Sequence, residues 1–252
     1  MKLLYLECNM GVAGDMLMGA LLELLPDKED FIKEINKIGI PNTKIEMSSS
    51  TKCGIVGTQM SVRIGEIEEE SIETNNHHKH HTHLKMSDIE HIIDCLQIEE
   101  TIKTDIKNIY HMIADAESRV HGKEVTEIHF HEVGRMDAIA DITGCVMLLH
   151  KLGVEKVITS PINVGFGQVN CAHGMLPVPA PATAYMLEGI PCYAGQIEGE
   201  LCTPTGIALV KYITKEYSNM PGMIIEKIGY GMGKKDYRAV NCVRAILGKS
   251  DV

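Results

Sequence analysis

The chain has 252 residues and a formal net charge of −10, from 24 Lys and Arg against 34 Asp and Glu. This length is enough for one large domain or two modest ones with hydrophobic cores. The acidic balance and the absence of a basic stripe exclude nucleic-acid binding, which depends on clustered Lys and Arg. No apolar run approaches the roughly 18 residues of a membrane span. The apolar N-terminus is typical of a buried strand rather than a signal peptide.

The eight cysteines are scattered, without a CxxC pair. In a chain of this length they are expected to be reduced core residues rather than a disulfide set. We therefore expect a cytoplasmic protein without a nucleic-acid or membrane partner.

The hydrophobic pattern predicts strands that alternate with helices. Strands are expected at residues 2–8, 44–51, 55–64, 127–130, 157–158, 162–169, 223–230 and 239–247. Helices are expected at about residues 14–25, 28–38, from 87 onward, 99–121, 135–152, 180–187 and 203–217. This alternation predicts an α/β or α+β fold, with a mixed sheet or sheets and flanking helices.

Residues 65–85 are acidic at first and then histidine-rich, with no apolar period. We expect a mobile, disordered loop at about residues 66–85 and a candidate sub-domain boundary there. Its five imidazoles belong to His77, His78, His80, His81 and His83. Imidazole nitrogens suit Ni²⁺, Zn²⁺ or Cu²⁺, and a flexible loop predicts exchangeable binding, as in a metal store. The alternatives are an expression tag, which an internal position disfavours, and a solvated low-complexity loop.

The segment IHFHEVG, residues 128–134, contains the second cluster. On a strand, His129 and His131 would point to the same face and form half of a metal site or an acid–base pair. Asp137 and Asp141 follow at i and i+4 on one face of the next helix, which predicts a mixed nitrogen and oxygen site. The alternative is that the carboxylates only interact with the helix dipole, which suits Asp137 better than Asp141.

Two strand–turn–helix junctions are candidate anion sites. In the turn at residues 11–15, backbone N–H groups around Gly14 and Asp15 can cradle a phosphate, although no dinucleotide or P-loop pattern is present. Asp15 can equally be a simple N-terminal helix charge. In the segment TPTG, Thr203 and Thr205 can contact phosphate at a helix start. Thr203 can equally be an N-cap followed by a first-turn proline.

Two further segments have weaker signals. Cys171 and His173 can form a nucleophile–base pair, but no third, orienting residue is evident. The glycines in GYGMG, residues 229–233, predict a tight, flexible turn before the last strand, with close approach of the backbone to a ligand as the alternative.

Together these segments resemble one family. They occur in the order LYLECNMGVAGDM, the histidine segment, IHFHEVGRMDAIADITG, CAHGMLPVPAPAT, LCTPTG, GYGMG and NCVRAILG. Over nearly its whole length, the chain closely resembles the N-terminal part of the LarC family of nickel insertion proteins. The resemblance implies a nickel chelatase that inserts Ni²⁺ into pyridinium-3,5-bisthiocarboxylic acid mononucleotide, which matures the nickel-pincer cofactor of lactate racemase. It also implies a dependence on CTP with Mg²⁺ or Mn²⁺.

The resemblance also implies roles for the candidate residues. The acceptor takes nickel through two sulfurs and one ring carbon, so a base must take up the proton displaced from that carbon. The candidate bases are His129, His131 and Glu132. The candidate mononucleotide contacts are Gly14, Asp15, His173, Thr203 and Thr205. The candidate nickel ligands are the five histidines of residues 77–83 together with His129, His131, Asp137 and Asp141.

In one respect the chain departs from the family. Members usually carry a C-terminal CTP-binding domain, which residues 1–252 lack, so CTP is not assigned to this chain. The expected partners are the mononucleotide, a separate C-terminal CTP-binding polypeptide, the lactate racemase apoenzyme and further copies in a homo-oligomer. Two alternatives stay open: a non-catalytic nickel store or metallochaperone, and a zinc-dependent hydrolase that uses His129, His131 and a carboxylate.

Overall fold

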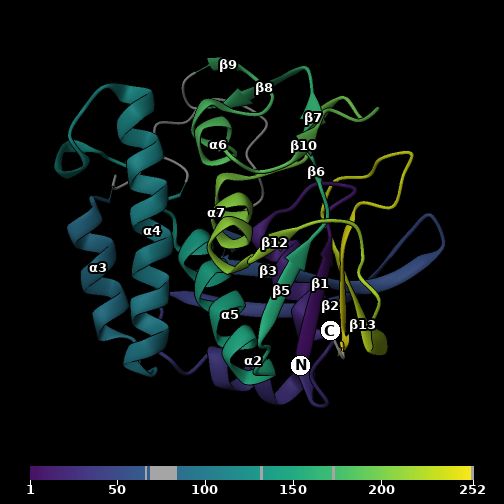
Figure 1. The fold of residues 1–252 in the computed structure, drawn as a ribbon. Coiled ribbons are helices and arrows are strands. Elements are labelled where there is room, and N and C mark those ends of the chain that lie inside the picture. The colour runs from purple at the N-terminus through teal and green to yellow at the C-terminus, as the bar shows by residue number, and fades with distance from the viewer. Residues whose placement is uncertain (66, 69–83, 131–132, 172–173, 251–252) are drawn as a thin grey trace.

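The computed structural model describes residues 1–65, 67–68, 84–130, 133–171 and 174–250. Its centre is an eight-stranded mixed sheet in the order β12-β5-β1-β14-β13-β3-β2, with β4 paired to β3 (Figure 1). The strands are β1 (Lys2–Glu7), β2 (Thr43–Lys52), β3 (Ile55–Ile64), β4 (Ile67–Glu68), β5 (Lys156–Thr159), β12 (Glu216–Tyr217), β13 (Ile224–Met232) and β14 (Cys242–Lys249). β1, β5 and β12 are parallel, whereas β14 is antiparallel to both β1 and β13.

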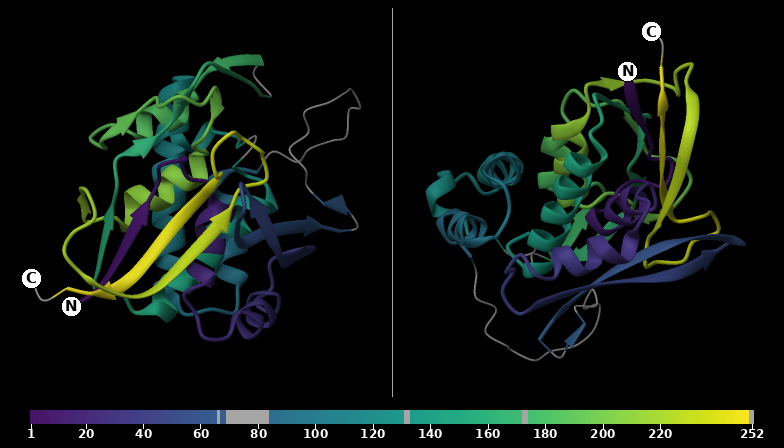
Figure 2. Two further views of the ribbon diagram at one scale, coloured as in Figure 1. Left: turned by 90° about the vertical axis from the view of Figure 1, so that its right-hand side faces the viewer. Right: turned by 90° about the horizontal axis from the view of Figure 1, so that it is seen from below.

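Helices cover one face of this sheet in two layers. They are α1 (Gly14–Leu22), α2 (Lys28–Ile35), α3 (Met86–Cys95), α4 (Glu100–His121), α5 (Met136–Leu152), α6 (Pro181–Met186) and α7 (Pro204–Ile213). α1, α5 and α7 lie near the sheet, and α3 and α4 lie outside them (Figure 2). The expected mixed α/β architecture is therefore confirmed. None of the helices in the described ranges is long and apolar enough to cross a membrane.

The chain between β5 and α7 is less regular than the sequence predicted. The single strand expected at 162–169 is divided into β6 (Ile162–Asn163), β7 (Gly165–Phe166) and β8 (Gln168–Cys171). Gly165 and Gly167 have φ values of +76° and +99°, which interrupt an extended strand. β9 (Gly174–Pro177), β10 (Cys192–Tyr193) and β11 (Gly199–Glu200) complete small two-stranded sheets with β8, β6 and β7.

The central strand β1 shows why the sheet is buried on both faces. Leu4 and Leu6 point into the main core beneath the helices. Leu3 and Tyr5 point to the opposite face, where they pack in a second cluster with Ile158 and Ile246. A strand that is buried on both faces has a nearly continuous run of apolar residues, and β1 has such a run at residues 3–6.

Two predicted elements were wrong in ways that affect the candidate site. No strand forms at 127–130: Val125–Glu127 is a 3-10 helix, and Phe130 makes only an isolated bridge to Leu84. Ile128 and Phe130 are instead used as buried anchors, with the Phe130 ring edge-on to Tyr110 at 6.4 Å. The helix expected at 203–217 ends at Ile213, because residues 216–217 pair with β5.

The cysteine prediction was half right. All eight cysteines are free. Cys8, Cys145 and Cys202 are buried as expected, but Cys53, Cys95 and Cys192 are exposed, so these three do not belong to the core.

The prediction of a turn at the glycine-rich segment GYGMG was wrong. Its first four residues lie within β13. A Cβ atom on Gly231 would lie 1.7 Å from the backbone oxygen of Met16 in α1. On α1 itself, a Cβ on Gly19 would lie 2.7 Å from the backbone oxygen of Thr58 in β3. The glycines therefore let α1 lie directly on the sheet backbone.

We predict that Gly231→Ala lowers the free energy of unfolding by about 3 kcal/mol or more, because α1 must move away from β13 to accommodate the methyl group. Urea denaturation measures this difference. The matched control is Gly222→Ala, since a Cβ there meets nothing within 4 Å. Equal effects of the two substitutions would contradict this account of GYGMG.

Candidate functional site

The carboxyl edge of the parallel strands gathers the start of three helices. α1 follows β1, while α5 and α7 precede β5 and β12, which run parallel to β1. The N-termini of all three helices therefore lie at this edge, where open α/β sheets usually bind ligands. The loop after β13, residues 233–241, returns at the same edge.

Two of the predicted anion motifs meet there. The Val12 N–H donates to the backbone oxygen of Leu201 at 3.0 Å, and the Thr203 N–H donates to the backbone oxygen of Val12 at 3.1 Å. A Cβ on Gly206 would lie 2.3 Å from that same Val12 oxygen. The turn after β1 and the start of α7 thus pack backbone to backbone, although nearly 190 residues separate them in the sequence.

The threonines of this junction are first of all structural. The Thr203 hydroxyl accepts from the Gly206 N–H at 3.2 Å, so it is the N-cap of α7, the alternative considered from the sequence. It also lies 3.0 Å from the Thr205 hydroxyl, which is largely buried. Contact of Thr203 and Thr205 with a mononucleotide stays a prediction.

A carboxylate joins α5 to the start of α1. A Cβ on Gly14 would lie 2.7 Å from the Asp141 Oδ2 atom, so glycine permits this approach. The Asp15 backbone N–H hydrogen-bonds to the Asp141 carboxyl group. Among the described residues, the buried Asp141 Oδ1 atom has no hydrogen-bond partner. One helical turn later, the Cys145 thiol donates to the backbone oxygen of Gly14 at 3.5 Å.

The carboxyl groups of Asp15 and Asp141 at this junction both have raised pKa values. Burial raises the pKa of Asp141 well above its ordinary value, and the negative charges of Asp15 and Asp137 raise it further. Burial likewise raises the pKa of Asp15, with an opposing effect from the positive charge of Lys234. Perturbed carboxyl groups of this kind often mark functional sites.

Asp137 fits better than Asp141 the alternative that the carboxylate only interacts with the helix dipole. Its Oδ1 atom accepts from the Ala138 N–H at 2.8 Å in the first turn of α5, where a negative charge is favourable. Even so, its charge reaches the same region, since together with Asp141 it raises the pKa of the buried Tyr110 beyond the effect of burial. The Tyr110 hydroxyl donates to the backbone oxygen of Val133 at 3.3 Å and thereby ties α4 to this edge.

The sequence did not identify Lys234 or Tyr110 as members of the site. Lys234 is exposed, and its loop is held by Lys52, whose Nζ atom donates to the Lys234 backbone oxygen at 3.1 Å. Gln59 holds the same loop through the Gly233 backbone oxygen at 3.1 Å. No sequence spacing relates Lys234 to Asp15, and the pairing of β13 with β3 and β14 brings its loop to this edge.

The remaining predicted residues are not assembled by the described structure. His129 is exposed, and the strand on which its pairing with His131 was based does not form. The following residues lie outside the described residues: His77, His78, His80, His81, His83, His131, Glu132 and His173. Within the described ranges, no group of three or more His, Cys, Asp or Glu side chains could hold a metal ion.

We predict that Asp141→Asn stabilises the fold at neutral pH. Because the pKa of Asp141 is raised in the folded state, the folded protein binds more protons than the unfolded chain above the ordinary value of 3.8, and stability falls as pH rises from there. Removing the charge should raise the free energy of unfolding at pH 7 by about 1–3 kcal/mol. Urea denaturation at pH values below 3.8 should show no difference in stability between Asp141→Asn and the wild type. The control is Asp115→Asn, a substitution at an exposed position, whose effect on stability should be the same at each pH. If the difference in free energy of unfolding between Asp141→Asn and the wild type were smaller at pH 7 than at pH 4, the prediction would be contradicted.

Several curated proteins are similar to nearly the whole of this chain. A putative nickel insertion protein of Dictyoglomus thermophilum is 42% identical over 249 residues, which cover 99% of this chain and 61% of the relative. Pyridinium-3,5-bisthiocarboxylic acid mononucleotide nickel insertion proteins of Geobacillus kaustophilus and Clostridium kluyveri are 39% and 40% identical. Those matches cover 99% and 100% of this chain but 60% and 63% of the relatives. The chain thus spans about three fifths of the length of the curated relatives it matches.

No solved structure matches the chain. The family model described as nickel insertion protein matches residues 4–252. This match runs from β1, which leads into the Asp15 turn, through α5 with Asp141, to the final strand. The chain therefore belongs to the nickel insertion protein family.

Proposed function

We propose that this chain is the N-terminal region of a nickel chelatase that inserts Ni²⁺ into pyridinium-3,5-bisthiocarboxylic acid mononucleotide, the substrate that its relatives' names give. The observation that supports it is the carboxyl edge, where the acidic pair Asp15–Asp141 lies beside the cation Lys234 and the starts of α1 and α7. This edge therefore combines groups that attract a metal cation with groups that attract a phosphate.

The acidic pair suits proton transfer during metal insertion. When nickel bonds to the ring carbon of the pincer, a proton must leave that carbon. A carboxylate with a raised pKa is a stronger base than an ordinary one. Burial and neighbouring carboxylates raise the pKa values of both Asp15 and Asp141. We assign proton uptake to this pair. His129, His131 and Glu132 stay candidates for the same role.

Nickel ligation requires softer donors than this pair. Imidazole suits Ni²⁺, whereas carboxylate oxygens alone suit Mg²⁺ or Mn²⁺ better. The proposed ligands are therefore His129 and His131, with Asp137 and Asp141 as oxygen donors. The nearby acidic charge favours the approach of Ni²⁺, because a cation offsets the repulsion between Asp15 and Asp141.

The mononucleotide phosphate is proposed to lie at the junction of the β1–α1 turn and α7. Helix N-termini present free N–H groups and a partial positive charge, which favour phosphate. Gly14, Thr203 and Thr205 belong to this junction, and Lys234 adds a full positive charge beside Asp15. His173 is proposed as a further contact of the mononucleotide.

The CTP-dependent part of the reaction is proposed to belong to the C-terminal part that the longer relatives carry. CTP with Mg²⁺ or Mn²⁺ is expected on the C-terminal part of the longer relatives, which this chain does not span. That part and the lactate racemase apoenzyme are the proposed partners, within a homo-oligomer in the cytoplasm. The alternatives, a nickel store and a zinc-dependent hydrolase, differ from this proposal in the outcomes of the following tests.

We predict that Asp141→Asn lowers the rate of nickel insertion by about 100-fold or more, the usual effect of removing a positioned proton acceptor. The assay combines the chain with Ni²⁺, the mononucleotide, CTP, Mg²⁺ and the C-terminal part of a relative, and mass spectrometry follows incorporation of nickel into the nucleotide. Greater stability together with lost activity distinguishes a functional carboxylate from a structural one. Asp115→Asn is the control, and an Asp141→Asn variant with wild-type activity would refute the assignment.

We predict that the histidine segment binds nickel weakly and in several equivalents. Replacing His77, His78, His80, His81 and His83 by Asn should remove these equivalents in nickel titrations of metal-stripped protein. Insertion at saturating Ni²⁺ should be unchanged, because the segment supplies the metal but takes no part in the chemistry. If insertion is absent in the wild type while the weak equivalents are present, the store alternative is favoured. A single tight zinc equivalent, indifferent to the segment, would favour the hydrolase.

A further inference from the structure

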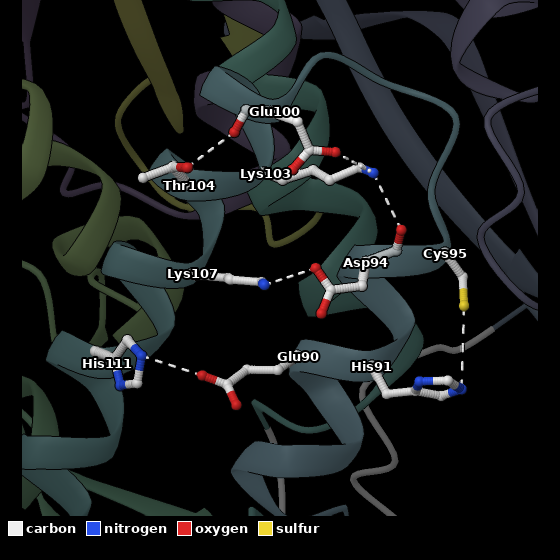
Figure 3. A network of polar contacts seen from close by, with 9 residues as sticks. All are labelled: Glu90, His91, Asp94, Cys95, Glu100, Lys103, Thr104, Lys107 and His111. Atoms are coloured by element: carbon white, nitrogen blue, oxygen red, sulfur yellow. Dashed lines mark hydrogen bonds and ion pairs between the residues drawn. The ribbon is translucent and has the colours of Figure 1, made fainter.

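The outer helix α3 carries a second pair of potential metal ligands, away from the carboxyl edge. His91 and Cys95 are four residues apart, so their side chains project from the same face of the helix. The His91 Nε2 atom lies 4.0 Å from the Cys95 Sγ atom. Figure 3 shows the two side chains pointing toward one another on the side of α3 that faces away from α4. Both residues are exposed, so a metal ion can reach them from solvent.

The other side of α3 is fixed against α4 by charged contacts. Asp94 pairs with Lys107 at 2.6 Å, and Glu90 pairs with His111 at 3.2 Å (Figure 3). Lys103 also donates to the backbone oxygen of Asp94 at 3.0 Å. The apolar contacts of Ile89 and Ile93, both fully buried, add to this docking. These contacts hold the backbone that carries His91 and Cys95 against α4.

Neither the His91 nor the Cys95 side chain makes a hydrogen bond to a described residue of this network. In the described part of the chain, the only hydrogen-bonding contact of either His91 or Cys95 is the one between them. By contrast, His111 is occupied by a carboxylate from the neighbouring helix. An exposed imidazole and an exposed thiol at this spacing, which among the described residues hydrogen-bond only to one another, have the composition of a chelating pair.

We propose that His91 Nε2 and Cys95 Sγ form a two-ligand surface site that binds one Ni²⁺ in exchangeable form. The thiolate is the ligand, so the thiol proton is released to solvent when the metal binds. An ion held by imidazole at about 2.1 Å and by thiolate at about 2.3 Å needs the donor atoms roughly 3–3.6 Å apart. The distance of 4.0 Å therefore closes with a small side-chain rotation.

The choice of nickel rests on the proposed function, because an imidazole and a thiolate also suit Zn²⁺ and Cu²⁺. With two protein ligands, the other coordination positions are left to water, so the ion stays exchangeable. His91 lies eight positions after His83 in the sequence, and α3 is the first helix after the histidine-rich segment. In the sequence, the pair is thus close to the histidines that we propose to supply nickel.

The test uses a background in which His77, His78, His80, His81 and His83 are all Asn, so that the segment cannot bind metal. Metal-stripped, reduced protein is titrated with Ni²⁺, and the near-ultraviolet charge-transfer band of a nickel–thiolate bond is recorded, which histidine ligands cannot produce. We expect a band that saturates at one equivalent and is absent in Cys95→Ser. His91→Asn should weaken binding by at least about tenfold, because the loss of even an outer-shell partner costs that much.

Control variants separate this site from the other exposed groups. Cys53→Ser and Cys192→Ser remove exposed thiols and should leave the band intact. His111→Asn removes an exposed histidine of α4 and should do the same. Cys95→His should keep one nickel equivalent without the thiolate band, which a merely structural cysteine would not do.

A band that persists in Cys95→Ser, or that disappears in Cys53→Ser, would overturn the proposal. The absence of any nickel–thiolate band while nickel insertion proceeds would refute this site and leave the proposed function intact. A band lost in Cys95→Ser, in a protein that never inserts nickel, would support the site and refute the proposed function.

Discussion

The position of α1 between the sheet and α5 is the constraint on which the rest of the structure depends. On one side, Gly19 of α1 and Gly231 of β13 remove the side chains that would hold the helix away from the sheet. On the other side, Gly14 lets the Asp141 carboxyl group approach the first turn of the helix. Close-packed interiors have little room to shift, so this contact fixes where α5 and the β1–α1 turn can lie.

That packing also creates the electrostatic character of the edge. Where α5 meets the first turn of α1, the fold brings the Asp141 carboxyl group close to Asp15, whose negative charge raises the pKa of Asp141. The cost of this like-charge contact is partly offset by Lys234 and by the Asp15 backbone N–H. A fold that keeps an unfavourable carboxyl pair, rather than an amide, indicates a function that needs the charge.

The outer pair of helices has a different character. Its inner faces are buried and its mutual contact is fixed by ion pairs, which are individually weak at a surface but together define one orientation. The exposed face of α3 carries an imidazole and a thiol that this packing does not use. The protein thus has acidic, partly buried groups at the edge of the sheet and softer, exchangeable ligands on its outer layer. This division suits a protein that receives a metal ion and passes it on.

By itself, the sequence determined the elements whose apolar periodicity is strong, such as β1, β3, α4 and α5, and the helical spacing of Asp137 and Asp141. Local chemistry also predicted Thr203 as a possible N-cap, because capping depends on neighbouring residues alone. The same periodicity misled at residues 127–130, where Ile128 and Phe130 alternate as in a strand but serve as anchors against α4.

Only the tertiary structure decided which distant residues share an environment. The β1–α1 turn meets the start of α7 through backbone hydrogen bonds, which leave no signature in side chains. The positive charge of Lys234 acts on Asp15 because β13 lies between β14 and β3, and no local sequence pattern determines this strand order. The glycines of GYGMG have the composition of a turn, but pairing with β14 makes the first four residues part of a strand, and the close approach of α1 explains why glycine is needed there. Periodicity reports what each segment prefers, whereas the site depends on long-range pairing, and that is fixed only when all the elements pack at once.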